Sequence, residues 1–434
     1  MISRDEYDNY ISILRDELVP AMGCTEPIAI AYASAKARSV LGEKVSRLHV
    51  SCSGNIIKNV KGVIVPNSGG QKGIEAAAIL GAVGGDESKE LEVIASANDE
   101  SRMLTKKLVR ENFCDVSLSE NVPNLFIEVT AKGSEHKATV RIENNHTNIT
   151  RITRDDKVIF EAEPEENESQ SQNPSGNKNM MKLRTILEFA DSLDVDDVKE
   201  LFDSQIECNT RISQEGLDNR WGARVGKTII AVWGKNVRSY ACARAAAGSD
   251  ARMSGCPLPV IINSGSGNQG ITVTMPVVTF AEEWCLSREK LYRALAVSNL
   301  VSIYIKHYIG SLSAFCGAVS ASCGAGAAIT YMAGGDYAGI ARTITNTLGN
   351  VGGIVCDGAK PSCAAKIASS VHAAILAHYM SMNDDEFRGG EGFVEDDVEE
   401  TIKNMGYIGK IGMKETDREI LNVMIDRVDV DSCM

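Results

Sequence analysis

Apolar positions in the first forty residues repeat at helical spacing. Ser3 and Glu6 have the spacing of a capping box, and this predicts a helix that runs to about Leu18. A second helix is predicted from Ile28 to about Leu41, with Thr25 as its N-cap. The chain therefore begins with two helices joined by a short turn.

From residue 47 to residue 162 the apolar positions mostly alternate with polar ones. Such runs are typical of strands, and four are predicted, at 48–52, 62–65, 125–129 and 138–142. Helices are predicted between them, at 72–83 and 99–110.

After residue 182 helical periodicity dominates the chain. Helices are predicted at 194–203, 287–308 and 415–426, and the alanine run 241–247 suggests closely packed helices. Between the two halves, an acidic and polar stretch has too little apolar surface to order itself.

The predicted fold class is α+β: an N-terminal mixed α/β domain followed by a mostly α-helical domain. We assign residues 1–160 to the first domain, 161–180 to a flexible linker or loop, and 181–434 to the second domain, which holds the cysteine-rich stretch described below.

One uncharged segment, 309–334, is long enough to resemble a membrane span. It is rich in Gly, Ala and Ser but has few large apolar side chains, so its transfer into lipid would gain little free energy. A helix buried in a protein core is the better interpretation, and no membrane partner is expected.

Charge and cysteine usage narrow the functional classes. With 45 basic and 58 acidic residues the net charge is −13, and no basic patch stands out, so nucleic acid is not an expected partner. The N-terminus leads directly into a helix pattern rather than a signal peptide, which favours a cytoplasmic protein. In that compartment the 12 cysteines are expected to be free, catalytic or metal-bound rather than paired as disulfides.

Four of these cysteines stand in the glycine-rich stretch 307–366: Cys316, Cys323, Cys356 and Cys363. Glycine lets the backbone approach a bulky group such as an anionic iron–sulfur cluster, whose usual ligands are cysteine thiolates. The spacing matches neither a zinc finger nor the compact ferredoxin pattern. From spacing alone, a metal site and buried structural cysteines remain equal alternatives.

Cys24 follows Gly23 and precedes the second predicted helix. At a helix N-terminus the macrodipole favours a thiolate, so a lowered pKa is expected. The alternative is a buried structural cysteine.

Five motifs stand out along the chain: Gly23-Cys24-Thr25-Glu26-Pro27, His146-Thr147-Asn148-Ile149, Asp250-Ala251-Arg252-Met253, the turn from Asn263 to Ile271, and Cys356-Asp357-Gly358-Ala359 with Cys363. Together they resemble the L-cysteine desulfidase family, which is related to the alpha chain of iron–sulfur L-serine dehydratases. The similarity covers nearly the whole chain.

The resemblance implies a 4Fe–4S cluster held by Cys316, Cys356 and Cys363, with Cys323 left out. It also implies β-elimination of L-cysteine to sulfide, ammonia and pyruvate, with Cys24 as the base that removes the Cα proton. An iron without a protein ligand would act as a Lewis acid on the β-substituent.

A small amino-acid substrate needs donors for its carboxylate. We expect them from Arg252 and from the backbone of the turn, and His146 is expected to bind substrate or transfer a proton. The substrate-binding candidates in the turn are Ser264, Gly265, Ser266, Gly267 and Asn268. A structural ion pair for Arg252 and a hydrogen-bonded loop histidine for His146 are equal alternatives.

Other functions compete with this one. L-Serine dehydration at the same type of cluster is the nearest enzymatic alternative, and a non-catalytic cluster-bearing redox sensor is the alternative from another class. A pyridoxal phosphate enzyme needs a Schiff-base lysine and a phosphate cup, for which no convincing sequence context exists. Cys433 is expected to lie in a frayed tail. The oligomeric state, a homo-oligomer included, stays open.

Overall fold

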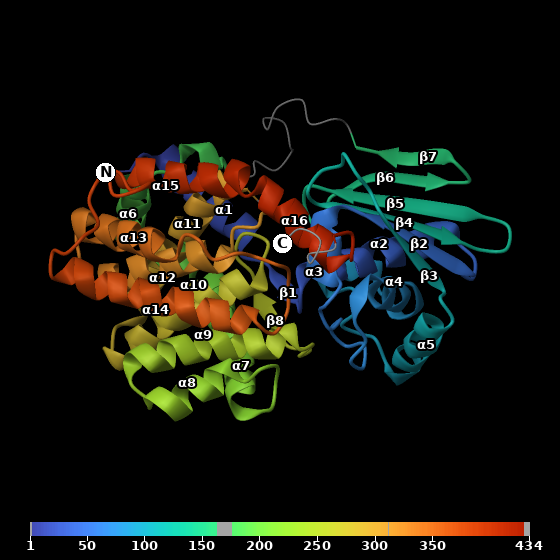
Figure 1. The fold of residues 1–434 in the computed structure, drawn as a ribbon, viewed down its shortest axis with the longest axis horizontal. Helices are drawn as coiled ribbons and strands as arrows, with labels where there is room; N and C mark the ends of the chain where they lie inside the picture. Colours follow the sequence, from blue (N-terminus) through green and yellow to red (C-terminus); the bar gives the residue numbers. More distant parts are fainter. Residues whose placement is uncertain (1, 163–175, 311, 429–434) are drawn as a thin grey trace.

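The computed structural model describes residues 2–162, 176–310 and 312–428. Most of the linker prediction, at 163–175, and the Cys433 prediction lie outside these residues. The predicted α+β class is confirmed. Figure 1 shows a sheet with its helices beside a larger helical body, coloured green to red.

The N-terminal half carries one six-stranded sheet of order β3-β2-β4-β5-β6-β7, in which only the β2–β3 pair is parallel. Its strands are β2 (Arg47–Cys52), β3 (Cys114–Leu118), β4 (Phe126–Lys132), β5 (Lys137–Glu143), β6 (Ile149–Arg154) and β7 (Lys157–Glu161). Its helices are α2 (Thr25–Leu41), α3 (Gly54–Val60), α4 (Gly73–Gly84) and α5 (Asp99–Arg110).

One face of this sheet packs against α2, because the strands alternate buried and more exposed residues. Helix α4 packs in turn on α2. A Cβ atom on Gly81 of α4 would lie 2.2 Å from the carbonyl oxygen of Ala31 in α2, so only glycine permits this approach. The position of α2 matters because Cys24 is its N-cap and Glu26 lies in its first turn.

The helical half is built around α12 (Gly317–Met332), which packs against α10 (Gly267–Glu283), α11 (Arg288–Ile309), α13 (Tyr337–Val351) and α14 (Cys363–Met382). Around these lie α6 (Leu183–Ser192), α7 (Lys199–Asp218), α8 (Val225–Trp233), α9 (Val237–Met253) and α15 (Val398–Tyr407). Small residues let the neighbours approach α12: a Cβ on Gly324 would lie 2.2 Å from the Ser298 carbonyl oxygen.

Short irregular helical segments complete the described elements. They are the 3₁₀ segments Glu87–Glu92, Lys178–Met180 and Val195–Asp197 and the π-helical segment Ile408–Gly412. No helix in the described ranges is long and apolar enough to cross a membrane. The segment 309–334 instead supplies the buried helix α12, as expected.

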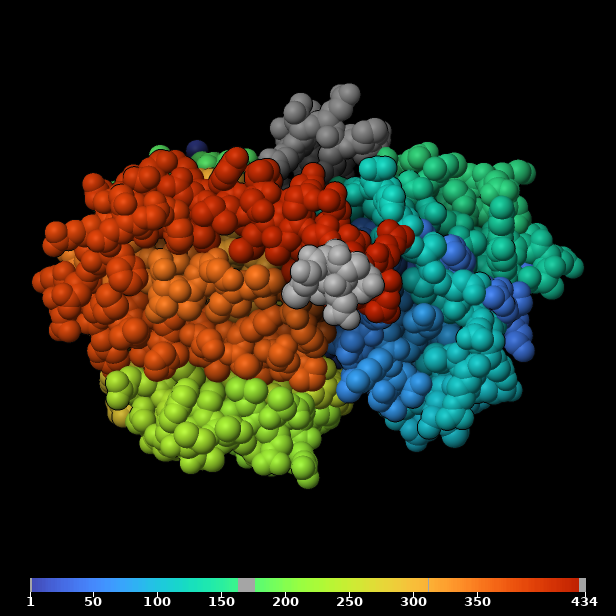
Figure 2. All heavy atoms as spheres, viewed as in Figure 1, coloured from blue at the N-terminus to red at the C-terminus, as the bar shows by residue number. Residues whose placement is uncertain are grey.

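Both ends of the described chain cross between the two halves. Helix α1 (Arg4–Glu17) packs against α6 and α11, and its Tyr7 hydroxyl donates to Asp197 at 2.7 Å. At the other end α16 (Lys414–Met424) packs on α3 of the N-terminal half. In Figure 2 the red C-terminal atoms reach from the helical body onto the blue and teal half. The domain boundaries at 160 and 180 stay a prediction.

A two-stranded sheet also joins the halves. Strand β1 (Pro20–Met22) pairs antiparallel with β8 (Pro259–Ile261), and the Ile262 N–H donates to the Val19 carbonyl at 3.0 Å. Helix α2 begins just after β1, and a single turn joins β8 to α10. The β1–β8 pairing therefore holds the start of α2 beside the turn that precedes α10.

Some predicted elements are wrong. Residues 62–65 form no strand: Val63 and Val65 are buried, but only Ile64 makes an isolated bridge, to Lys72. Cys24, not Thr25, is the N-cap of α2. The helix predicted at 194–203 begins at Lys199 and continues to Asp218. Strands β1, β3, β6, β7 and β8 were not predicted, and four of them are only three to five residues long.

Candidate functional site

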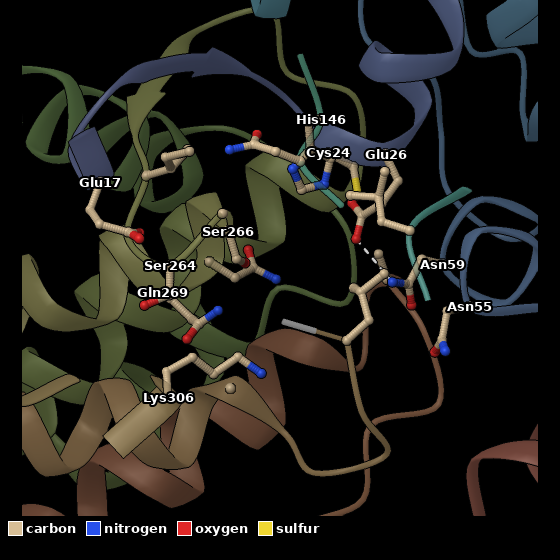
Figure 3. A pocket seen from close by; sticks show the side chains of 18 of the residues that line it. Glu17, Cys24, Glu26, Asn55, Asn59, His146, Ser264, Ser266, Gln269 and Lys306 are labelled. Atoms are coloured by element: carbon tan, nitrogen blue, oxygen red, sulfur yellow. Dashed lines mark hydrogen bonds between the residues drawn. The ribbon is translucent and has the colours of Figure 1, made fainter. Parts of the chain in front are cut away.

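A cavity of about 710 Å³ lies between the two halves of the molecule. Its lining includes Cys24, Glu26, Asn59, His146, Arg252, Ser264, Gly265, Ser266, Asn268, Gln269, Lys306, Cys316, Cys356 and Cys363. In Figure 3, His146, Cys24 and Glu26 gather on one side, Ser264, Ser266 and Gln269 lie near the middle, and Lys306 extends toward the space below them. Residues from distant parts of the sequence therefore share one pocket.

Ten of the eleven residues that sequence reasoning selected line this cavity; the exception is Gly267. Gly267 is the first residue of α10, and a Cβ atom there would lie 2.4 Å from Nε of Arg252. Gly267 therefore lies beside Arg252, and its lack of a side chain leaves room for the guanidinium group.

The turn before α10 lines the cavity, and part of its backbone is left-handed. Ser264 and Gly265 both have positive φ angles, of 49° and 74°. Asn263 and Ser266 close the turn with backbone hydrogen bonds of 3.2 and 3.0 Å. The Thr25 hydroxyl lies 3.0 Å from the Gly265 carbonyl oxygen, which ties the turn to the start of α2.

Backbone pairing brings two of the cavity cysteines together. Phe315 and Val355 form an antiparallel bridge, and the Cys356 N–H donates to the Ala314 carbonyl at 2.6 Å. Cys316 is the N-cap of α12, and Cys363 is the first residue of α14. Burial raises the pKa of Cys316 to about 12, and the neighbouring Cys356 adds to this rise. Thiols that raise one another's pKa in a buried pocket need a cationic group to become thiolates together.

The donor set fits an iron–sulfur cluster. Cationic side chains lie close by: Lys366 donates to the Val355 carbonyl at 2.7 Å, and Lys360 pairs with Asp357 at 2.6 Å. In the described ranges no three His, Cys, Asp or Glu side chains lie close enough to hold a single metal ion. A cluster binds each thiolate to a different iron, so its ligands lie farther apart than those of one ion. Three thiols that line one cavity are the type of donor that an iron–sulfur cluster uses.

Cys323 lies apart from this set. It is fully buried in α12 and does not line the cavity. Burial raises its pKa, as expected of a cysteine that packs as a small apolar side chain.

The expected lowering of the Cys24 pKa is wrong. Cys24 does stand at the N-terminus of α2, but burial raises its pKa well above the usual value, and the adjacent Glu26 carboxylate raises it further. Arg252 opposes this rise without reversing it. The thiol donates to Oε2 of Glu26 over 3.0 Å. The fully buried position and a nearby anion outweigh the helix dipole, so Cys24 is a protonated thiol at neutral pH.

Glu26 is the anion at this site. Burial alone would raise its pKa, but His146, the Cys24 hydrogen bond and Arg252 together lower it below the usual value. Asn59 donates to Oε1 of Glu26 at 2.9 Å, drawn as a dashed line in Figure 3. Glu26 was not predicted as a functional residue, although its carboxylate stands two residues after Cys24 in the sequence.

Several buried polar atoms around the cavity have no hydrogen-bond partner in the described structure. They are Nε of Arg252, Nε2 of His146, Oδ1 of Asn55, Oδ1 of Asn268 and Oε1 of Gln269. Buried polar groups are nearly always paired, so a cluster of unpaired donors and acceptors indicates a polar ligand. Sequence reasoning gave no role to Asn55 or Gln269, although Gln269 lies within the turn from Asn263 to Ile271.

Arg252 is the main cationic group on this side of the pocket. It is only 2% exposed, and its charge lowers the pKa of the nearby Glu26. A buried arginine whose Nε has no hydrogen-bond partner in the described structure is a strong candidate for binding a carboxylate. A structural ion pair stays the alternative role, with Glu26 as the nearby anion.

Burial lowers the pKa of His146, although Glu26 favours its protonated form. His146 is consequently neutral near pH 7 and can donate or accept one hydrogen bond to a ligand.

Lys306 is a further cavity residue that the sequence analysis did not select. It lies on α11, is 7% exposed, and burial lowers its pKa to about 8 while Cys356 and Cys316 oppose the change. Its signal in the sequence is that no other charged residue follows Arg293 on this helix before position 306. A single lysine in a buried apolar run indicates a site-facing cation.

Comparison with known proteins agrees with this assembly of motifs. The chain matches the serine dehydratase alpha chain family over residues 88–422. It is 50% identical to a UPF0597 protein of Finegoldia magna, over 96% of this chain and 100% of the relative. A UPF0597 protein of Lachnoclostridium phytofermentans is also 50% identical, over 97% of this chain and 100% of the relative.

A more distant relative, from Fusobacterium nucleatum, is 42% identical over 96% of this chain and 98% of its own. These relatives match at least 96% of this chain, and the family match covers the end of the α/β half and nearly all of the helical half. On this basis, the chain belongs to the serine dehydratase alpha chain family.

Proposed function

We propose that this protein is an iron–sulfur lyase that catalyses β-elimination of L-cysteine to sulfide, ammonia and pyruvate. The family supports a dehydratase-type lyase, and the specificity for cysteine is our inference. The observation that carries it is that Cys24 and the three cysteines Cys316, Cys356 and Cys363 line one cavity. A site at the interface between two parts of a chain is a common place for a small substrate.

Cys316, Cys356 and Cys363 are the residues that would hold a 4Fe–4S cluster. When bound, such a cluster supplies a Lewis acid beside the substrate's β-substituent. The chain itself supplies positive charge for an anionic group through Lys306, which is buried in the same cavity.

The amino-acid end of the substrate matches the unpaired polar atoms. The guanidinium of Arg252 has the charge and geometry for the carboxylate. The amide oxygens of Asn268 and Gln269 lack donors, and an α-ammonium group supplies them. Together these contacts hold the Cα–H bond in one orientation within the cavity.

The reaction then needs a group that accepts the Cα proton. Cys24 lines the cavity and remains our candidate for that role, with the neutral His146 as the alternative. Loss of the Cα proton and of sulfide leaves aminoacrylate, which hydrolyses to pyruvate and ammonia. One cysteine and one water therefore yield one pyruvate, one ammonia and one hydrogen sulfide.

L-Serine dehydration is the second candidate, because the matching family is described as serine dehydratase. Both substrates carry a β-heteroatom. A thiolate is a softer ligand for iron than a hydroxyl, so a simple open site favours cysteine. A sulfur leaving group also needs less help from an acid than hydroxide does.

Anaerobically purified protein tests the proposal. We expect sulfide and pyruvate in equal amounts from L-cysteine and slower or no pyruvate from L-serine. Cys24→Ala should keep the visible absorption of the cluster and lose turnover. If serine is the faster substrate, the protein acts as a dehydratase. A coloured protein that turns over neither amino acid favours the redox sensor.

A further inference from the structure

In the described structure the Cys24 thiol donates a hydrogen bond to the Oε2 atom of Glu26, at 3.0 Å. Both groups are buried beside the cavity, and Glu26 occupies the first turn of the helix that Cys24 caps. A cysteine that carries its own proton cannot take another from a substrate unless that first proton has somewhere to go.

We propose that Glu26 accepts the Cys24 thiol proton while the Cys24 sulfur removes the Cα proton, so that the two residues form a proton-transfer pair. This inference rests on the proposed function and assigns Glu26 a role through Cys24. Glu26 itself need not touch the substrate.

The hydrogen bonds around Glu26 leave one of its oxygens for this task. Oε1 accepts from Asn59 at 2.9 Å. Oε2 faces the Cys24 sulfur and lies 3.1 Å from the Thr25 hydroxyl, which has the Gly265 carbonyl as a second acceptor. Oε1 is thus fixed by an amide donor, and the proton from the thiol arrives at Oε2.

The charges that face the pair favour an ionised Glu26 before the reaction. Burial would raise the pKa of Glu26, but the protonated form of His146, the Cys24 hydrogen bond and the charge of Arg252 together lower it. At neutral pH, where His146 is neutral, Arg252 is the cation that acts on it. The carboxylate is therefore able to receive a proton at neutral pH, whereas the thiol beside it keeps its own.

The step balances in atoms and electrons. The Cα–H bond breaks and its proton moves to the Cys24 sulfur, while the S–H bond of Cys24 breaks and that proton moves to Oε2 of Glu26. The Cα–H electron pair becomes the Cα=Cβ bond, and the Cβ–S pair leaves with sulfide. The proton held by Glu26 then returns through Cys24 to the departing sulfide.

Glu26→Gln separates this role from a simple electrostatic one. The carboxylate raises the Cys24 pKa, so its removal makes the thiolate easier to form. If Glu26 only suppressed the thiolate, the variant would be a faster enzyme. If Glu26 accepts the proton, the variant loses about 10²–10⁴-fold in kcat, the usual contribution of a proton-transfer group, with little change in KM.

The experiment uses the anaerobically purified, cluster-containing protein and two readouts. The first is the pH profile of Cys24 alkylation by iodoacetamide, measured on the Cys24 peptide by mass spectrometry. We expect its midpoint to move to lower pH in Glu26→Gln, whether or not the protein turns over cysteine. The second is kcat, together with deuterium incorporation at Cα of substrate recovered from D2O. Both should fall in this variant and recover in part in Glu26→Asp.

Glu75→Gln is the matched control, because Glu75 is an exposed glutamate in the first turn of α4. It should keep wild-type kcat and the wild-type alkylation profile. Wild-type kcat in Glu26→Gln, or an unmoved alkylation midpoint, overturns the proton-transfer pair. If the wild type instead uses only L-serine, the cysteine specificity is wrong, and the same variants test the pair with serine. If wild-type protein exchanges the Cα proton of neither amino acid, both proposals fail.

Discussion

Lys58 on α3 and Asp417 on α16 form an ion pair between the two halves, although they stand 359 positions apart in the chain. The lysine is 2% exposed and the aspartate 17%. Lys58 also lines the cavity. The C-terminal helix therefore neutralises a buried cation in the wall of the candidate active site.

This relationship predicts a stability effect. Asp417→Asn removes the counter-charge and leaves a buried ammonium group, so we expect a loss of roughly 3 kcal/mol in the free energy of unfolding. Urea denaturation measures it. Lys58→Met combined with Asp417→Leu should recover most of the loss. Glu415→Gln, on an exposed residue of the same helix, is the control and should change stability by less than about 0.5 kcal/mol. Equal losses of stability in Asp417→Asn and in the control Glu415→Gln would contradict the role of the ion pair.

The cavity cysteines give a prediction about iron content. Replacing any one of Cys316, Cys356 and Cys363 by Ser should abolish cluster binding, because each of these cavity cysteines is proposed to hold a different iron of the cluster. Iron analysis and the visible absorption spectrum after anaerobic purification measure this. Cys323→Ser and the exposed Cys285→Ser are controls that should keep iron. Normal iron in any of the first three variants would remove that cysteine from the ligand set.

Arg252 predicts a binding effect. Arg252→Lys keeps the positive charge but loses the planar fork that binds a carboxylate through two hydrogen bonds. We expect KM for the amino acid to rise about tenfold, equivalent to about 1.4 kcal/mol, with a smaller change in kcat. Steady-state kinetics measure it. Arg238→Lys, on an exposed residue of the same helix α9, should behave as the wild type. An unchanged KM in Arg252→Lys would mean that another group binds the carboxylate.

His378 predicts a pH-dependent stability. Burial lowers its pKa from 6.5 to about 4, and its ring nitrogen Nδ1 lies 2.9 Å from the Thr330 hydroxyl in the core. Between these two values the unfolded chain binds a proton that the folded chain does not, so stability falls as pH decreases from 6.5 to 4. The shift corresponds to a loss of roughly 3 kcal/mol at the lower pH.

Denaturation at several pH values from 7 to about 4 checks this prediction, because the slope with pH counts the protons taken up on unfolding. His378→Leu should flatten that part of the profile. His372→Leu, on an exposed residue of the same helix α14, should not. If the two variants give the same slope as the wild type, His378 is not the group that titrates.

Local interactions explain which elements the sequence predicts well. The helix at 99–110 matches α5 in both of its ends, since Asn98 caps it through its own side chain. The capping box of Ser3 and Glu6 is present because both partners lie three residues apart. The strand predicted at 62–65 is wrong because an apolar run can be buried in a turn as well as in a strand. Only the presence of a neighbouring strand decides between the two.

The sequence by itself therefore determined the α+β class, most helices, and ten residues of the cavity lining, since motifs and periodicity are local properties. Tertiary structure decided what those residues are next to. A local view of Cys24 includes the helix dipole and predicts a thiolate, but packing buries the thiol and sets Glu26 beside it, which reverses the direction of its pKa. Lys306 and Gln269 entered the site only when α11 and α10 packed around it. Burial and charge depend on distance in space, and the order of residues along the chain does not fix that distance.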